Sequence, residues 1–223
     1  MTECGRSRLD RRRIAFIDAA HDLFIKQGYE STTLVDVVTY AGGSLATLYK
    51  LFGNKEGLLT AVLYENVRSC DIVVQQIGSR DAAPAAILLD LGHEFARRFL
   101  DPERVAFSRI VIAHSLKNQE FSTMFHQTTQ VRTGDSLARL FARWRNQGVE
   151  FLGTPEGNAD LFLGMFIADL YCEAINHGAI TCNSHQAVAE RVEFFLRGIG
   201  MKGANLTEKA PDADGPKPAV LEV

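Results

Sequence analysis

Several histidines and carboxylates could in principle act in acid–base or metal chemistry. His93, His114 and His126 are the candidate histidines, and Asp169 and Glu173 stand four residues apart. None of these residues has the spacing that such chemistry needs. The chain lacks a His-Glu-x-x-His motif, a nucleophile elbow and a glycine-rich phosphate loop. The sequence therefore predicts no catalytic residue, no metal site and no cofactor.

A second group of polar residues could bind a partner. Leu48 and Phe52 lie four residues apart, so a short helix could bury both on one face. The opposite face would then carry Ala46, Thr47 and Lys50, with Tyr49 at its margin. Hydroxyl, ammonium and methyl groups on an exposed helix can contact the base edges and phosphates of DNA.

The segment before this helix predicts how it is positioned. Apolar residues there recur with helical spacing, at Leu34, Val37, Val38 and Ala41. Thr32 or Thr33 can cap the start of that helix, Gly42 can end it, and Ser44 can cap the next one. Two short helices joined by a tight turn form a helix-turn-helix, whose second helix enters the major groove.

Basic residues flank this motif on both sides. Five arginines precede the first apolar periodicity, at Arg6, Arg8, Arg11, Arg12 and Arg13. They could form a solvated tail, but the motif downstream favours an arm over residues 1–13 that contacts phosphates. Behind the motif, Asn54 can cap a helix whose first turn holds Lys55, a second phosphate-binding position.

The run from Gly28 to Leu59 resembles the N-terminal domain of the TetR family of transcription regulators. The matching residues are Gly28, Tyr29, Thr32 or Thr33, Ala41, Gly42, Ser44, Leu48, Tyr49, Phe52, Lys55, Glu56, Leu58 and Leu59. Three positions depart from the family pattern. Gly43 replaces a valine and should loosen the turn, while Leu45 and Leu51 replace residues that are often polar or aromatic.

The resemblance implies a ligand-responsive repressor that binds a palindromic DNA operator as a homodimer. The stretch from Ala106 to Thr129 also resembles the AefR-type C-terminal domain of one TetR subgroup, which would bind a small effector. The residues predicted to contact DNA are Arg12, Thr33, Ser44, Ala46, Thr47, Tyr49, Lys50 and Lys55.

The remainder of the chain predicts helices only, so the expected fold class is all-α. A long helix from Asn54 to about Ile77 would connect a DNA-binding domain, residues 1–53, to a ligand-binding and dimerisation domain, residues 54–200. Further helices are expected over 84–100, 102–117, 119–129, 131–147, 155–177 and 184–198. Residues 201–223 are expected to form a disordered tail.

Two functional regions are predicted in the second domain. The last two helices of each subunit form the dimer interface in this family, which here implies Leu161, Gly164, Ala168, Val192, Phe195 and Leu196. Aromatic residues from several helices suggest a pocket for an apolar or aromatic effector, as ligand cavities are mostly apolar with a few polar anchors. Its predicted lining is Phe107, His114, Phe125, Trp144, Phe166 and Asp169, and His114 is the preferred anchor.

Composition limits the other possibilities. The net charge of −3 argues against indiscriminate coating of nucleic acid and permits a basic face on an acidic body. The polar first thirteen residues do not resemble a signal peptide, and no apolar run reaches membrane-spanning length, so a cytoplasmic protein is expected. An all-helical ligand-binding enzyme with a vestigial helix-turn-helix is the alternative, and a purely structural interaction protein is the third possibility.

Overall fold

The computed structural model describes residues 8–176 and 184–201. These residues form nine helices and no strand, which confirms the predicted all-α fold. The helices are α1 (Arg8–Gln27), α2 (Leu34–Ala41), α3 (Leu45–Phe52), α4 (Lys55–Gly78), α5 (Pro84–Phe99), α6 (Pro102–Ser115), α7 (Gln119–Asn146), α8 (Pro155–Asn176) and α9 (His185–Gly198). No helix in this part of the chain combines the length and apolar character needed to cross a bilayer.

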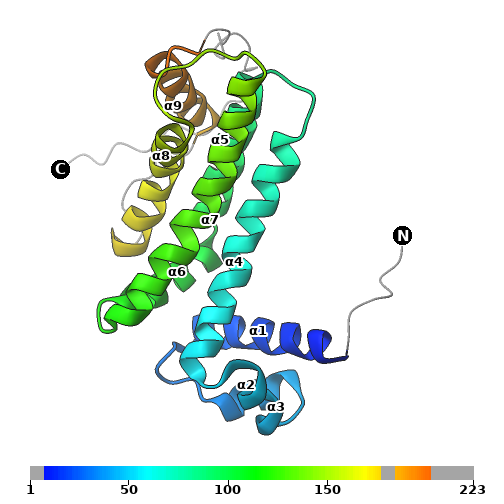
Figure 1. Cartoon of the computed structure of the whole chain (residues 1–223). Helices are drawn as coiled ribbons and strands as arrows, with labels where there is room; N and C mark the ends of the chain where they lie inside the picture. The colour runs from blue at the N-terminus through cyan, green and yellow to red at the C-terminus, as the bar shows by residue number, and fades with distance from the viewer. Residues whose placement is uncertain (1–7, 177–183, 202–223) are drawn as a thin grey trace, which may run out of the picture.

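The molecule is elongated, with a small helical head at one end and a long helical body (Figure 1). Helices α1, α2 and α3 form the head, and α4 rises from it along the body formed by α5 to α9 (Figure 1). In the body, α7 packs on both α4 and α8, and α9 packs on α5. One continuous helix therefore links the two ends of the molecule.

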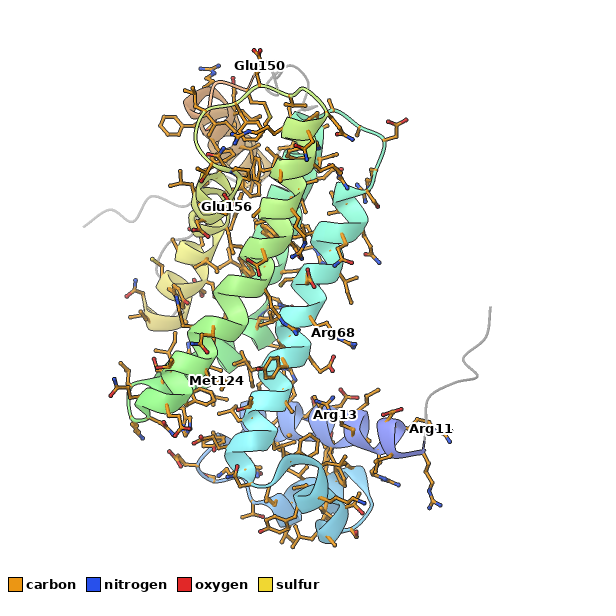
Figure 2. The ribbon with its side chains drawn as sticks, viewed as in Figure 1. Arg11, Arg13, Arg68, Met124, Glu150 and Glu156 are labelled. Atoms are coloured by element: carbon orange, nitrogen blue, oxygen red, sulfur yellow. The ribbon has the colours of Figure 1, made fainter. Side chains whose placement is uncertain are left out.

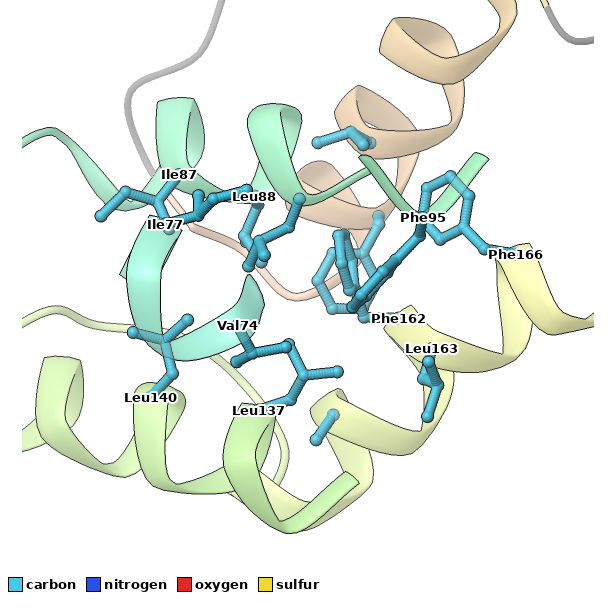
Figure 3. Packing of buried hydrophobic residues seen from close by; sticks show 14 of the residues in the cluster. Val74, Ile77, Ile87, Leu88, Phe95, Leu137, Leu140, Phe162, Leu163 and Phe166 are labelled. Carbon is cyan, nitrogen blue, oxygen red and sulfur yellow. The ribbon is translucent and has the colours of Figure 1, made fainter. Parts of the chain in front are cut away.

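Two hydrophobic clusters hold this arrangement together. The larger fills the body, where Val74, Leu137, Phe162 and Phe166 meet from three helices (Figure 3). The smaller fills the head, but it continues into α6 and α7 through Phe107, Val111 and Phe121. The apolar core of the head is thus shared with the first half of the body.

Two sequence predictions differ from the structure. A helix break was expected between 129 and 131, yet α7 runs unbroken from Gln119 to Asn146. Its middle carries no proline, and both ends are anchored, by the Asn118 cap and by packing on α4 and α8. Of the predicted tail, Met201 is buried in the body core, and residues 202–223 lie outside the described residues, as do 1–7 of the predicted arm.

Candidate DNA-binding surface and internal cavity

Side-chain caps start both helices of the helix-turn-helix. Thr33 forms a reciprocal capping box with Asp36, whose carboxylate accepts from the Thr33 amide at 2.8 Å. This backbone hydrogen bond and a second one from the Thr33 hydroxyl lower the pKa of Asp36. Ser44 begins α3, where its hydroxyl accepts from the Thr47 amide at 3.1 Å. The caps therefore set where α2 and α3 begin.

The turn between these helices is anchored by an arginine from α1. Arg12 Nη1 donates to the carbonyls of Ala41 and Gly42, at 3.1 and 2.9 Å. Gly43 follows with φ of 112°, and a Cβ there would lie 3.1 Å from Phe16 Cζ and 3.3 Å from Arg12 Cδ. A valine would be strained here, so Gly43 permits a close approach, contrary to the expectation that it loosens the turn.

The other predicted basic positions divide into two kinds. Arg8 and Arg11 are exposed on the first turn of α1, and Arg11 lies at the outer end of that helix (Figure 2). Arg13 instead lies 3.5 Å from Glu65 Oε1. Residues 8–13 thus belong to α1, and two of its four arginines in this stretch, Arg12 and Arg13, contact other parts of the protein.

The outward face of α3 carries the predicted DNA contacts. Ala46, Tyr49 and Lys50 are exposed, Thr47 is half-buried, and Leu48 is buried against the head. Within the described residues, Lys50 has no ion pair or hydrogen bond from its side chain. Leu51, one of the departures from the family pattern, packs against the head cluster, so its role is structural. The face therefore offers an ammonium, a hydroxyl and small groups to a partner.

Lys55 is held more tightly than expected. Its ammonium donates to the Glu30 carbonyl at 3.1 Å and lies 4.4 Å from the centre of the Tyr29 ring. Partial burial lowers the pKa of Lys55. Asn54 caps α4 as predicted, accepting from the Gly57 amide at 2.7 Å. Lys55 therefore ties the start of α4 to the turn that follows α1.

His114 lies at the junction of the head and the body. Its Nε2 is 3.0 Å from Glu56 Oε2, and Asn118 Nδ2 donates to the same oxygen at 2.9 Å. The rings of Tyr29 and Phe121 pack on either side, with centroids 5.0 and 4.7 Å away. Burial, Glu56 and Glu30 together raise the pKa of Tyr29 to about 12. The end of α6 is thus bound to the first turn of α4.

The body contains a cavity of about 100 Å³ between α4, α6, α7 and α8. Phe107 and Phe125, two of the six predicted pocket residues, line it. The complete lining is Leu63, Asn66, Val67, Cys70, Phe99, Arg104, Phe107, Ser108, Val111, Ile112, Phe125, Thr133, Leu163, Ile167, Leu170 and Tyr171. An apolar wall with few polar groups is typical of a small-molecule site.

Four predicted pocket residues lie elsewhere. His114 is in the junction described above. Trp144 packs edge-on against Phe141 near the far end of the body, and Phe166 packs against other phenylalanines of the body core (Figure 3). Asp169 forms an ion pair with Arg191 of α9. Trp144 and Phe166 therefore belong to the body core, and the side chains of His114 and Asp169 are paired with carboxylate and guanidinium groups outside the cavity.

Arg104 is a cavity residue that the sequence predictions missed. Its Nη2 donates to Ser69 Oγ at 2.6 Å, and its Nη1 lies 3.6 Å from Cys70 Sγ. The signal was present in the sequence, because Arg104, Phe107, Ser108 and Val111 follow the i, i+3, i+4, i+7 spacing of one helical stripe. In the described chain, no three potential metal-binding side chains converge, at the cavity or elsewhere.

The predicted dimer residues fall into two groups. Leu161, Gly164 and Ala168 are exposed along one side of α8. On α9, the predicted residues Val192, Phe195 and Leu196 are buried within the subunit, because that stripe of α9 faces the body core. The exposed apolar residue of α9 is instead Phe194, with 78% of its surface accessible.

Comparison with known proteins gives two family matches. The model described as "Bacterial regulatory proteins, tetR family" matches residues 16–62. The model described as "AefR-like transcriptional repressor, C-terminal domain" matches residues 86–198, more than half of the chain. Together they span the head and most of the body.

Individual proteins agree with these matches. The HTH-type transcriptional repressor BdcR of Escherichia coli (strain K12) is 25% identical over 141 residues, which cover 62% of this chain and 72% of that protein. The structure of a putative TetR-family regulator from Mesorhizobium loti MAFF303099 superposes with a TM-score of 0.73 at 23% identity, covering 86% of this chain and 98% of that one. The flavonoid-responsive regulator FrrA superposes with a TM-score of 0.64 at 25% identity, covering 84% and 96%.

Proposed function

The chain belongs to the TetR family and is a helix-turn-helix transcriptional repressor, and we propose that it binds a palindromic operator as a homodimer and is released by a small effector. The family consists of DNA-binding regulators, which decides against the enzyme alternative. We further propose that residues 1–53 act as the DNA-binding domain and residues 54–200 as the ligand-binding and dimerisation domain.

The proposed DNA contacts are built on the face of α3. Ala46, Thr47 and Lys50 are directed to base edges, while Ser44, Tyr49 and Thr33 flank them toward the phosphates. Arg12 and Lys55 are assigned a positioning role first, because their cationic groups already hold the turn and the start of α4. The exposed Arg8 and Arg11 are the basic groups of α1 that remain available for phosphates.

The proposed dimer uses the exposed apolar side of α8. Leu161 and Ile175 each leave 63% of their surface accessible, and Gly164 and Ala168 lie between them on the same side. Small residues at the centre of such a stripe allow two helices to approach closely. Phe194 of α9 extends the same kind of surface. A dimer is needed because a single recognition helix reaches too few base edges to be specific.

One observation carries the proposal that an effector controls DNA binding. Helix α6, which forms one wall of the cavity, contacts α4 near both of its own ends. Arg104 bonds Ser69 and Cys70 near the start of α6, and His114 bonds Glu56 near its end. Glu56 lies in the first turn of α4, a few residues after the recognition helix α3. A ligand that shifts α6 would therefore move the head.

The free energy of ligand binding limits how far an effector can change the affinity for the operator. A ligand changes an equilibrium only by its differential affinity for the two states, typically about 1–3 kcal/mol, or roughly 5- to 150-fold in operator affinity. The recognition helices of a dimer should sit about 34–36 Å apart to read two half-sites. A small displacement of α4 changes that spacing. The predicted apolar or aromatic effector is supported by the apolar lining, and the relative FrrA is described as flavonoid-responsive.

Selection of bound duplexes from a random library tests the DNA-binding proposal without any ligand. The wild-type protein should enrich a palindrome, and Lys50→Ala should change the enriched bases. Arg80→Ala removes the same charge in the turn after α4, far along the chain from α3, and should leave the selected sequence unchanged. Failure to enrich any sequence would refute the proposal.

Sedimentation tests the dimer. Gly164→Arg should give a folded monomer, because a Cβ at Gly164 meets no atom within 4 Å inside the subunit. Ala86→Arg places the same side chain on an exposed position of α5 and should remain dimeric. If Gly164→Arg also stays dimeric, the interface lies elsewhere.

A further inference from the structure

The cavity places a cationic group beside an otherwise apolar wall. The partly buried Arg104 guanidinium lines the cavity, and its described partners are a hydroxyl and a thiol, on Ser69 and Cys70. Among the described residues, no carboxylate lies within ion-pair distance of it. A charged group taken out of water without a counter-ion is costly, so this arrangement favours an anion from outside the chain.

Ser69, the nearest partner of Arg104, already uses all its hydrogen-bonding capacity. Ser69 Oγ donates its only proton to the Asn66 carbonyl at 2.7 Å. It then accepts from both Arg104 Nη2 at 2.6 Å and Arg98 Nη1 at 3.3 Å. Two guanidinium groups thus share one neutral oxygen.

The carboxylate next to this pair is already committed. Glu94 accepts two hydrogen bonds from Arg97, at 2.9 and 2.7 Å, and one from Arg98 at 2.5 Å. These contacts, from Arg97 first, lower the pKa of Glu94 to about 2, so it is ionised at neutral pH and pairs with both arginines. Glu94 is therefore not available to balance the positive charge of Arg104.

The geometry points to a small monocarboxylic acid as the effector, with its carboxylate on Arg104 and its apolar part against Phe107, Val111, Ile112 and Leu163. This inference rests on the proposed function of the cavity as the effector site. A guanidinium binds a carboxylate through two parallel hydrogen bonds. Ser108 and Tyr171 add hydroxyl donors to the lining, and burial raises the pKa of Tyr171, which keeps its phenol protonated.

The size of the cavity limits the apolar part. An engineered cavity of about 150 Å³ in another protein holds benzene. The cavity here is smaller, at about 100 Å³, so it encloses a short branched chain or part of one ring. A 3-methylbutanoate-sized acid fits within this limit, a benzoate-sized acid fits with its ring partly outside, and a long-chain acid does not fit.

The same contact explains how such a ligand would act. Arg104 connects α6 to α4 through Ser69 and Cys70. A ligand carboxylate competes with that hydroxyl and thiol for the guanidinium. Binding therefore weakens one of the two polar contacts between α6 and α4, and the other, at His114, lies closest to the head.

A pair of fluorinated probes tests the carboxylate. In a 19F NMR titration, 4-fluorobenzoate should bind the full-length wild-type protein at least about tenfold more tightly than 4-fluorobenzamide, since a charge-assisted pair is lost with the amide. Unlabelled 3-methylbutanoate should displace the acid. Arg104→Gln should weaken the acid by about 10- to 100-fold and leave the amide unchanged, and Arg104→Lys should restore part of the loss.

Arg68→Gln provides the matched control. Arg68 lies on α4 with an exposed side chain and pairs with Glu65 at its surface (Figure 2). Its removal changes the net charge equally and should leave both probes unaffected. A general electrostatic effect would instead weaken the acid in both variants.

Three results would overturn the inference. They are equal binding of acid and amide by the wild type, equal loss of both probes in Arg104→Gln with circular dichroism unchanged, and no saturable binding of either acid. None of them affects the duplex selection, which needs no ligand. A neutral compound that binds the cavity and releases the selected duplex would retain the proposed function while excluding the carboxylate.

Discussion

Two arginines in different regions of the molecule show opposite uses of the same side chain. In the head, Arg12 has its guanidinium bonded to two carbonyls at the end of α2. In the body, the partners of Arg104 among the described residues are a hydroxyl and a thiol. Arg12 stood out in the sequence because it belongs to a basic cluster, and Arg104 did not. The remaining hydrogen-bonding capacity, and not the residue type, indicates which arginine is available to a ligand.

Gly43, which packs against Arg12, is the site of the largest expected effect on stability. Its substitution tests whether the turn is anchored in the way described. Gly43→Val should lower the free energy of unfolding by about 1–3 kcal/mol, because the backbone is left-handed there and the new Cβ meets Phe16 and Arg12. Urea denaturation followed by circular dichroism measures the change. The control Gly134→Ala lies in α7, where a Cβ meets only Asp160 at 3.5 Å, and should not destabilise the protein. Unchanged stability in Gly43→Val would show that the turn is not anchored as described.

Replacing each arginine compares the two regions directly. Arg12→Gln should cost roughly 1–2 kcal/mol of unfolding free energy, because two carbonyls lose a charged donor. Arg104→Gln should cost less than about 0.5 kcal/mol, because removing a poorly paired guanidinium also removes its desolvation penalty. Denaturant titrations of both variants provide the comparison. Equal losses would mean that Arg104 is as structural as Arg12.

The junction between the regions can be separated from the cavity. His114→Ala should leave the affinity for a cavity ligand unchanged, since His114 does not line the cavity, and should reduce the coupling to DNA by about 0.5–2 kcal/mol. Ligand binding with and without duplex measures that coupling. Ser115→Ala is the neighbouring control, because the buried Ser115 hydroxyl has no hydrogen-bond partner among the described residues. A loss of ligand affinity in His114→Ala would instead indicate that His114 contributes to the ligand site, as the sequence had suggested.

The smallest expected effect concerns Glu94, the carboxylate that pairs with Arg97 and Arg98 and not with Arg104. The pKa of Glu94 is lowered from its ordinary value of 4.5 to about 2, so its ion pairs stabilise the fold above pH 4.5 and are lost as the pH falls toward 2. Glu94→Gln should flatten this acid dependence by less than about 1 kcal/mol, since Arg97 is largely exposed. Stability measured from pH 6 to 2.5 tests it. Glu156→Gln, at an exposed glutamate without an ion pair in the described chain, should leave the dependence unchanged (Figure 2).

The sequence by itself determined the helix-turn-helix and most of the helices, although it divided α7 in two. Helical spacing, caps and terminating glycines act within a few residues, so Ser44 and Asn54 could be identified as caps from the chain alone, and the first cap could be narrowed to Thr32 or Thr33. The family resemblance and the all-α class followed from the same short-range patterns and are confirmed. Phe107 and Phe125, which the aromatic pattern suggested for a pocket, line the cavity, and their contact with an effector stays a prediction.

Only the tertiary structure decided which way each stripe faces. The family resemblance and the apolar spacing of α9 predicted that Val192 lies in a dimer interface, but packing on α5 places Val192 in the subunit core and leaves Phe194 exposed. In the same way, Arg104 and His114 lie on one helix, yet the first borders the cavity and the second bonds Glu56. Periodicity is a property of one helix, whereas burial and pairing depend on neighbours that are distant in the chain, so these assignments required the folded molecule.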